Sequence, residues 1–166
     1  MDPFGTDTMK KTADEWFTEY AESHQNRFNK LVHWICVPAI AASIAGLLWA
    51  VPMPPALRDV SPLINLATIA IAISMAFYFR LSIPLAVGML AFWMTVVAII
   101  AAYGQRAGDG SVLVASVILF VVAWIGQFIG HSVEGKKPSF FQDLQFLLIG
   151  PAWLLHFIYR RLNIRY

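Results

Sequence analysis

Residues 110–130 read GSVLVASVILFVVAWIGQFIG and contain no aspartate, glutamate, lysine or arginine. A helix needs about 20 predominantly apolar residues to cross the roughly 30 Å hydrocarbon core of a bilayer. A helix that is apolar all round has no polar face to turn towards water, so its expected surroundings are lipid. This stretch therefore predicts a transmembrane helix.

Three further apolar runs precede this stretch, separated from it and from one another by short links. They cover residues 31–57, 60–79 and 81–105. Hydrophobic residues make up 58% of the 166-residue chain and charged residues only 13%, about half the charge typical of a soluble domain. Because short links make consecutive helices antiparallel neighbours, the sequence predicts an all-α integral membrane bundle of about four transmembrane helices.

The segment before the first run predicts an amphipathic helix. Trp16, Phe17 and Tyr20 recur at spacings of three and four on one side, while the acidic residues lie mostly elsewhere. We expect residues 9–30 to form an interfacial helix at the membrane surface or to cap the bundle. Residues 1–8 resemble a vector-derived leader, with Met9 as the expected native start.

The end of the chain predicts a shorter membrane element. The apolar stretch 144–159 is interrupted by Gly150-Pro151, which favours a re-entrant or interfacial helix over a short fifth span. The chain would then be a single membrane domain over residues 9–166. Four spans would occupy residues 31–130, and residues 131–166 would form a loop and re-entrant helices on one face.

The distribution of charge predicts an orientation. With four spans, both ends of the chain and the Arg80 turn share one side, which holds ten of the twelve lysines and arginines. Cytoplasmic loops carry an excess of positive charge, so this side should face the cytoplasm, in a bacterial inner membrane or the endoplasmic reticulum. A fifth span would reduce the split to seven against five. No basic stripe with interleaved aromatics is present, so nucleic acid is not an expected partner.

The histidines are the strongest indication of a site. His24, His33, His131 and His156 all fall on the predicted cytoplasmic face, although they are distant in sequence. A single interfacial histidine is usually a structural residue, but polar side chains gathered at membrane depth tend to mark sites. His24 and His33 would lie on opposite faces of one straight helix, so both can serve one site only if the chain bends near residues 23–26.

The surroundings of His131 suit a metal centre. Glu134 lies one turn after His131, and a histidine together with a carboxylate suits iron, zinc or manganese. Glu134 could equally neutralise Lys136 or Lys137. Four histidines are too few for the eight-histidine di-iron sites of membrane desaturases, so a mononuclear centre is the simpler expectation.

Two segments resemble the 2-hydroxy fatty acid dioxygenase family. They are YAESHQNRFNKLVH at residues 20–33 and WIGQFIGHSVEGKKP at residues 124–138, which carry the patterns H-x4-N-x3-H and G-H-x2-E-x3-P. Gly150-Pro151 follows downstream. The resemblance implies an Fe(II)-dependent dioxygenase that uses O2 to convert a 2-hydroxy fatty acid to the acid one carbon shorter.

The resemblance also implies roles for single residues. His24, His33 and His131 match the family's motif histidines and are the expected catalytic metal ligands, whereas His156 is a further candidate ligand from its predicted location alone. Candidate partners of the ligand rings or of the substrate are Tyr20, Asn29, Gln127, Glu134, Lys136 and Lys137. The two lysines could attract the substrate carboxylate or simply contact membrane phospholipid.

Two other classes of protein remain open at this point. A haem-binding membrane protein would use two histidines as axial ligands. A non-catalytic lipid-binding or assembly protein would use the histidines structurally. A transporter is a weaker alternative, because no acidic or basic residue lies along the middle of any predicted span.

Overall fold

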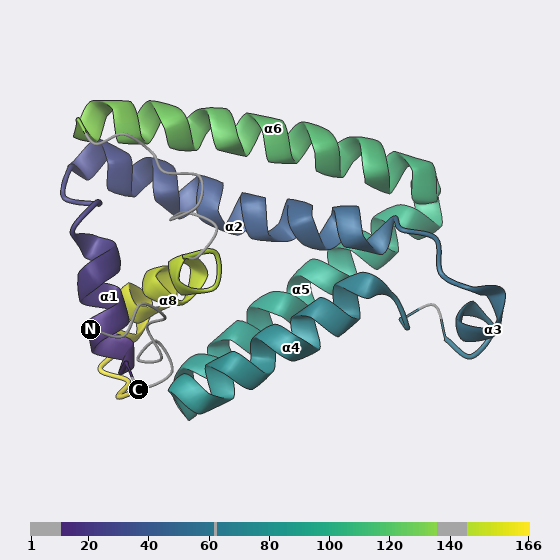
Figure 1. Cartoon of the computed structure of the whole chain (residues 1–166), viewed down its shortest axis with the longest axis horizontal. Coiled ribbons are helices and arrows are strands. Elements are labelled where there is room, and N and C mark those ends of the chain that lie inside the picture. The colour runs from purple at the N-terminus through teal and green to yellow at the C-terminus, as the bar shows by residue number, and fades with distance from the viewer. Residues whose placement is uncertain (1–10, 62, 136–145) are drawn as a thin grey trace, which may run out of the picture.

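The computed structural model describes residues 11–61, 63–135 and 146–166, and all regular elements within them are helices (Figure 1). In chain order these helices are α1 (Ala13–Ala21), α2 (Arg27–Trp49), α3 (Pro55–Arg58), α4 (Leu66–Leu81), α5 (Ile83–Ala107), α6 (Asp109–Glu134) and α8 (Ile149–Arg161). The all-α prediction is confirmed. The prediction about residues 1–8 lies outside the described residues.

Three helices are long and apolar enough to cross a membrane. The mean hydropathy over an 18-residue stretch is 2.0 within α2, 2.4 within α5 and 2.5 within residues 110–134 of α6. Large hydrophobic side chains on their outer faces are exposed, such as Ile35 at 68% and Ile118 at 58%. Exposed apolar surface on this scale is typical of contact with lipid, as expected for a membrane protein.

The second of the four predicted spans, residues 60–79, is only partly borne out. Its helix, α4, has 16 residues and begins at Leu66 because Asn65 caps it, with the Asn65 side chain accepting the Thr68 N–H at 3.1 Å. At a rise of 1.5 Å per residue α4 is about 24 Å long, which is shorter than a typical hydrocarbon core. The structure therefore has three candidate spans and one shorter apolar helix among its described residues.

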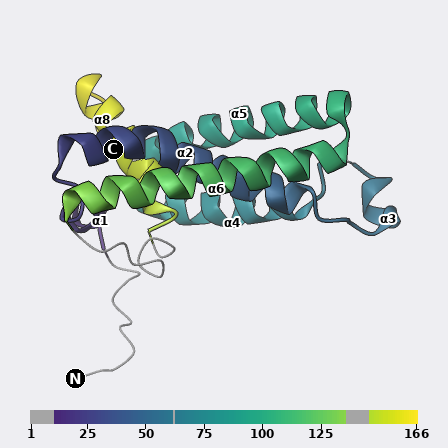
Figure 2. The same cartoon turned by 90° about the horizontal axis from the view of Figure 1, so that it is seen from above.

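Helices α2 and α6 run antiparallel and lie side by side along most of their lengths (Figures 1 and 2). Small residues allow this close approach. A Cβ atom on Gly46 would lie 2.1 Å from Ser116 Oγ, and one on Gly126 would lie 2.6 Å from Cys36 Sγ. Small residues at helix interfaces are how membrane helices gain van der Waals contact, since lipid gives no hydrophobic drive to associate.

Helices α4 and α5 form an antiparallel hairpin that crosses below α2 in Figure 1. Ser82 ends α4 and caps α5, accepting the Leu85 N–H at 3.4 Å. Two tyrosines tie α8 to this hairpin: Tyr78 donates to the Leu148 carbonyl at 2.7 Å, and Tyr159 donates to the Pro84 carbonyl at 2.7 Å. The turn of the hairpin thus lies at the same end of the bundle as α8.

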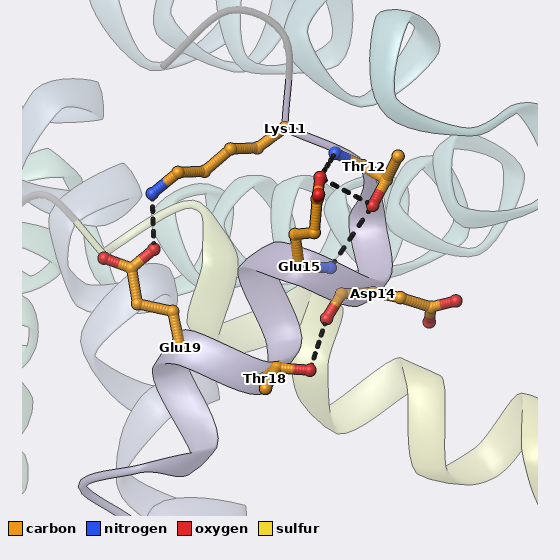
Figure 3. A network of polar contacts seen from close by, with 6 residues as sticks. All are labelled: Lys11, Thr12, Asp14, Glu15, Thr18 and Glu19. Atoms are coloured by element: carbon orange, nitrogen blue, oxygen red, sulfur yellow. Dashed lines mark hydrogen bonds and ion pairs between the residues drawn. The ribbon is translucent and has the colours of Figure 1, made fainter. Parts of the chain in front are cut away.

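The predicted N-terminal amphipathic helix is α1, and its start is specified by a capping box (Figure 3). Glu15 accepts the Thr12 N–H at 2.7 Å, while the Thr12 hydroxyl accepts the Glu15 N–H at 3.3 Å. Lys11 pairs with Glu19 at 2.7 Å. These reciprocal bonds satisfy amide groups that a helix start otherwise leaves without partners, so α1 begins at Ala13. It covers only part of the predicted segment 9–30, because the chain turns after Ala21 and α2 begins at Arg27.

Helix α8 packs against α1 and α5 and has only 13 residues. Pro151 lies in its first turn, where the missing N–H of proline costs no helical hydrogen bond. Because α8 is too short to be a candidate span, a complete fifth crossing is not found among the described residues. Its re-entrant or interfacial placement, like that of α1, stays a prediction.

Candidate metal centre

Three of the predicted histidines converge at the end of the bundle where α2 begins and α6 ends. His24 follows α1, His33 lies in the second turn of α2 and His131 lies in the last turn of α6. One ligand nitrogen from each ring lies within 4.8 Å of the other two, and all three residues are buried. The structure thus contains the convergence that the sequence predicted.

A bend between α1 and α2 makes this convergence possible. Helix α1 ends at Ala21 and α2 begins at Arg27, with the Asn26 side chain accepting the Phe28 N–H at 2.8 Å as an N-cap. The ring centroids of His24 and His33 therefore lie 4.2 Å apart, although a straight helix would separate them. The predicted bend near residues 23–26 is confirmed.

Backbone carbonyls hold the rings of His24 and His33. The Nδ1 atom of His24 lies 2.6 Å from the Tyr20 carbonyl, and that of His33 lies 2.9 Å from the Asn29 carbonyl. A carbonyl only accepts, so each Nδ1 carries the proton and each Nε2 keeps its lone pair. This is the usual arrangement of a metal-ligating histidine, whose other nitrogen is fixed by a second hydrogen bond.

The environment of His24 favours a metal ligand further. Its Nε2 is buried and has no hydrogen-bond partner among the described residues. Burial lowers the pKa of His24 to about 4, so the ring is neutral at physiological pH, which is the form that binds metals. The Tyr20 ring stacks on His24 with centroids 4.2 Å apart, and that of Trp153 lies 5.6 Å away. Sequence reasoning did not select Trp153, since only tertiary packing brings it here.

Glu134 joins the loop of His24 to the helix of His131. Its carboxylate accepts the backbone N–H groups of Gln25 and Asn26, both at 2.8 Å, and the Asn29 amide at 3.1 Å. Among the described residues Glu134 is not part of the group that could hold a metal. Glu134 therefore lies next to the ligands and acts as a clamp, because its hydrogen bonds hold the turn between α1 and α2. Lys136 and Lys137, its alternative partners, lie outside the described residues.

Asn29 packs into a space that only glycine leaves open. A Cβ atom on Gly130 would lie 2.5 Å from Asn29 Oδ1. Asn29 is fully buried, and its backbone carbonyl holds the His33 ring. The contact between these two residues therefore sets how closely the His33 turn of α2 approaches the His131 turn of α6.

Gln127 lies one turn before His131 and borders a cavity beside the histidines. The cavity measures about 30 Å³ and is also lined by Tyr20, His33 and Gly150. Gln127 is buried, and its Oε1 atom has no hydrogen-bond partner among the described residues. A buried amide oxygen without a partner is costly, so it points to a group that this cavity receives.

The fourth histidine does not join the group. His156 Nδ1 is bonded to the Tyr166 hydroxyl, and its ring lies 5.0 Å from that of Phe17. Tyr166 in turn donates to Asp14 at 3.2 Å. Because the ring faces α1 and the C-terminal residues, the structure does not support the expectation that His156 is a fourth ligand.

The packing of the rings decides between the kinds of metal site. The centroids of His24 and His131 lie 5.3 Å apart, and those of His33 and His131 lie 5.0 Å apart. Three imidazoles in edge-to-face contact suit one small cation. A porphyrin plane between any two of them would require the helices to separate, so the geometry disfavours haem.

Fold and site together define a class of protein: a helical membrane protein with a candidate mononuclear metal centre of three buried histidines. A family model described as 2-hydroxy-palmitic acid dioxygenase Mpo1-like matches residues 10–162. The chain therefore belongs to this family, and the resemblance seen in the sequence is confirmed. Neither the curated proteins nor the solved structures contain a significant match.

Proposed function

We propose that this protein is an Fe(II)-dependent dioxygenase that α-oxidises 2-hydroxy fatty acids to fatty acids one carbon shorter. The observation that carries the proposal is the convergence of three buried imidazoles at one end of apolar helices, in a chain whose family is described as dioxygenase-like. The conversion balances with one O2 consumed and one CO2 and one water released. It needs no added reductant.

His24, His33 and His131 are the proposed ligands. Imidazole nitrogen suits iron, zinc, copper and nickel, and the Nε2 of His24, which has no hydrogen-bond partner among the described residues, supports a role as a donor to such an ion. The family's chemistry consumes O2, which favours iron over redox-inert zinc. Bound Fe(II) would supply the redox chemistry that directs O2 to the hydroxyl-bearing carbon of the substrate.

Protein groups around the ligands would place the substrate. The unpartnered Oε1 atom of Gln127 would accept the hydrogen bond of the 2-hydroxyl group, at the cavity that His33 also lines. Tyr20 and Trp153 cover His24 with aromatic surface and would keep bulk water from the reaction. Lys136 and Lys137 remain proposed attractors of the substrate carboxylate.

The proposed site faces the cytoplasm. The histidine centre, α8 and the turn between α4 and α5 lie at one end of the bundle (Figure 1). Arg80 ends α4, and Arg160 and Arg161 end α8, so positive charge gathers at that end. Such an excess is typical of cytoplasmic faces. A long acyl chain could then lie among the helices while its polar head reaches the metal.

The experiment is an anaerobic reconstitution followed by exposure to O2. Purified protein is loaded with Fe(II), given 2-hydroxypalmitate and assayed for pentadecanoate, with His131→Ala as the matched variant. We expect O2-dependent product from the wild type and none from the variant. Absence of both a stoichiometric transition metal and product in the wild type would favour a non-catalytic lipid-binding protein, whereas equal product from both proteins would overturn His131 as a ligand. A Soret band would favour haem.

A further inference from the structure

A second cavity lies deeper in the helices than the one beside the histidines. It measures about 100 Å³ and is lined by α2, α4, Trp93 of α5 and residues 147–148. Its lining is almost wholly apolar, and Ser74, its one hydroxyl, donates internally to the Ile71 carbonyl at 2.7 Å. A ligand held there would thus meet mainly hydrocarbon surface. Among the lining residues, Trp93 has a buried Nε1 atom with no hydrogen-bond partner in the described part of the chain.

The two cavities adjoin at Leu147, which is a lining residue of both. One face of α2 runs past this junction. Val37 and Ile40 line the cavity beside His33, and the next turns of the same helix line the deeper cavity as far as Leu48. At 1.5 Å per residue, the distance from His33 to Leu48 is about 22 Å, which is close to the length of an extended palmitoyl chain.

Small side chains create the deeper space. Ala41 and Ala45 of α2 face Ala67 and Ala70 of α4 across the cavity. Larger residues at these positions would close it, because α2 and α4 are packed neighbours. The polar end of the path carries the His33 ring and the unpartnered Gln127 oxygen, so the two ends differ in chemistry as the two ends of a fatty acid do.

We propose that the cavity between α2, α4 and α5 binds the hydrocarbon tail of the substrate, with Leu147 at the boundary between the tail and the reacting head. This inference rests on the proposed function. Burial of each methylene group is favourable and additive, so a cavity of limited length selects chain length. Ala70 is then a residue that determines specificity, since a larger side chain there shortens the available space.

Photo-crosslinking tests the binding site without relying on turnover. Fe(II)-loaded wild-type protein in detergent is irradiated with a 2-hydroxypalmitate analogue that carries a diazirine near the end of its tail. We expect labelling of the α4 or α5 peptides that contain Ala70 or Trp93, suppressed by excess 2-hydroxypalmitate. Labelling of outward-facing residues alone, or labelling that only phospholipid suppresses, would overturn the proposal and indicate a lipid site.

Chain-length selectivity tests the role of Ala70. We expect Ala70→Phe to lower kcat/KM for 2-hydroxypalmitate on the order of tenfold while leaving 2-hydroxyoctanoate nearly unchanged. The matched control is Ala72→Phe, two residues along the same helix on its exposed face. Equal effects of the two variants on both acids would overturn the tail site. A wild type inactive on both acids would instead overturn the proposed function, and the crosslinking would still report on the tail site.

Discussion

Two buried histidine sites contact α1, through Tyr20 and Phe17, and they differ in the partners of their ring nitrogens. In the first, the buried Nε2 of His24 has no hydrogen-bond partner within the part of the chain that the structure describes, and it lies beside two further imidazoles. In the second, His156 is bonded to the Tyr166 hydroxyl and packed on Phe17. Both are buried, so burial does not distinguish them. A candidate ligand is distinguished by a ring nitrogen that makes no hydrogen bond among the described residues and lies close to the nitrogens of other histidines.

The largest expected effect separates the two sites directly. Replacing His24, His33 or His131 with alanine should lower metal affinity by more than about 100-fold, because even outer-shell changes at metal sites cost 10–100-fold. Metal content measured by elemental analysis is the readout. The control is His156→Ala, which should retain its metal. Loss of metal in the His156 variant alone would reverse the comparison.

The next effect concerns the clamp that positions His24. Glu134→Gln should lower metal affinity on the order of tenfold, since an amide cannot accept the Gln25, Asn26 and Asn29 donors as a carboxylate does. Titration of the metal-free protein with Fe(II) or Co(II) measures the effect. Unchanged affinity together with unchanged stability would show that the α1–α2 turn holds His24 without Glu134.

A smaller effect is expected from the helix contact beneath the site. Gly130→Ala places a methyl group 2.5 Å from Asn29 Oδ1 and should destabilise the protein by about 1–3 kcal/mol through overpacking. Thermal unfolding in detergent measures it. Gly110→Ala is the matched control on the same helix, because nothing lies within 4 Å of its added Cβ. Equal melting temperatures for the two variants would contradict the close packing of α2 on α6.

The smallest effect belongs to the second histidine site. Tyr166→Phe removes the hydroxyl that bonds to His156 and Asp14 and should cost about 1 kcal/mol of stability, the usual net value of a hydrogen bond. Metal content and product formation should not change. A variant that folds as the wild type does but loses metal would bring His156 back among the candidate ligands.

Sequence periodicity and composition predicted most of the helices, but they gave the wrong start for α4. The all-apolar runs of α2, α5 and α6 need no partner to be recognised, because lipid exposure requires apolar residues on every face. For residues 60–79 composition was a poor guide. The helix begins only at Leu66, where Asn65 and Thr68 satisfy its first amide groups, and this local capping shortens it.

For the site, the sequence indicated which histidines gather, but not what holds each ring or which histidine stays apart. Four histidines on one predicted face indicated a metal, and the family motifs singled out His24, His33 and His131. Nothing in the position of His156 in the sequence showed that its Nδ1 atom would be hydrogen-bonded to the Tyr166 hydroxyl. That pairing depends on where the C-terminal residues return against α1, which is a contact between residues far apart in the chain.

The sequence by itself determined that the chain forms apolar helices, that its basic residues favour one face and that its histidines gather there. These properties depend on local composition and on topology. Only the tertiary structure decided how closely the three imidazoles meet, that Glu134 holds the turn between α1 and α2 rather than joining them, and that a cavity lies between α2, α4 and α5. The reason is that the angles of helix packing and the shapes of side chains set distances of a few ångströms, which a linear pattern does not encode.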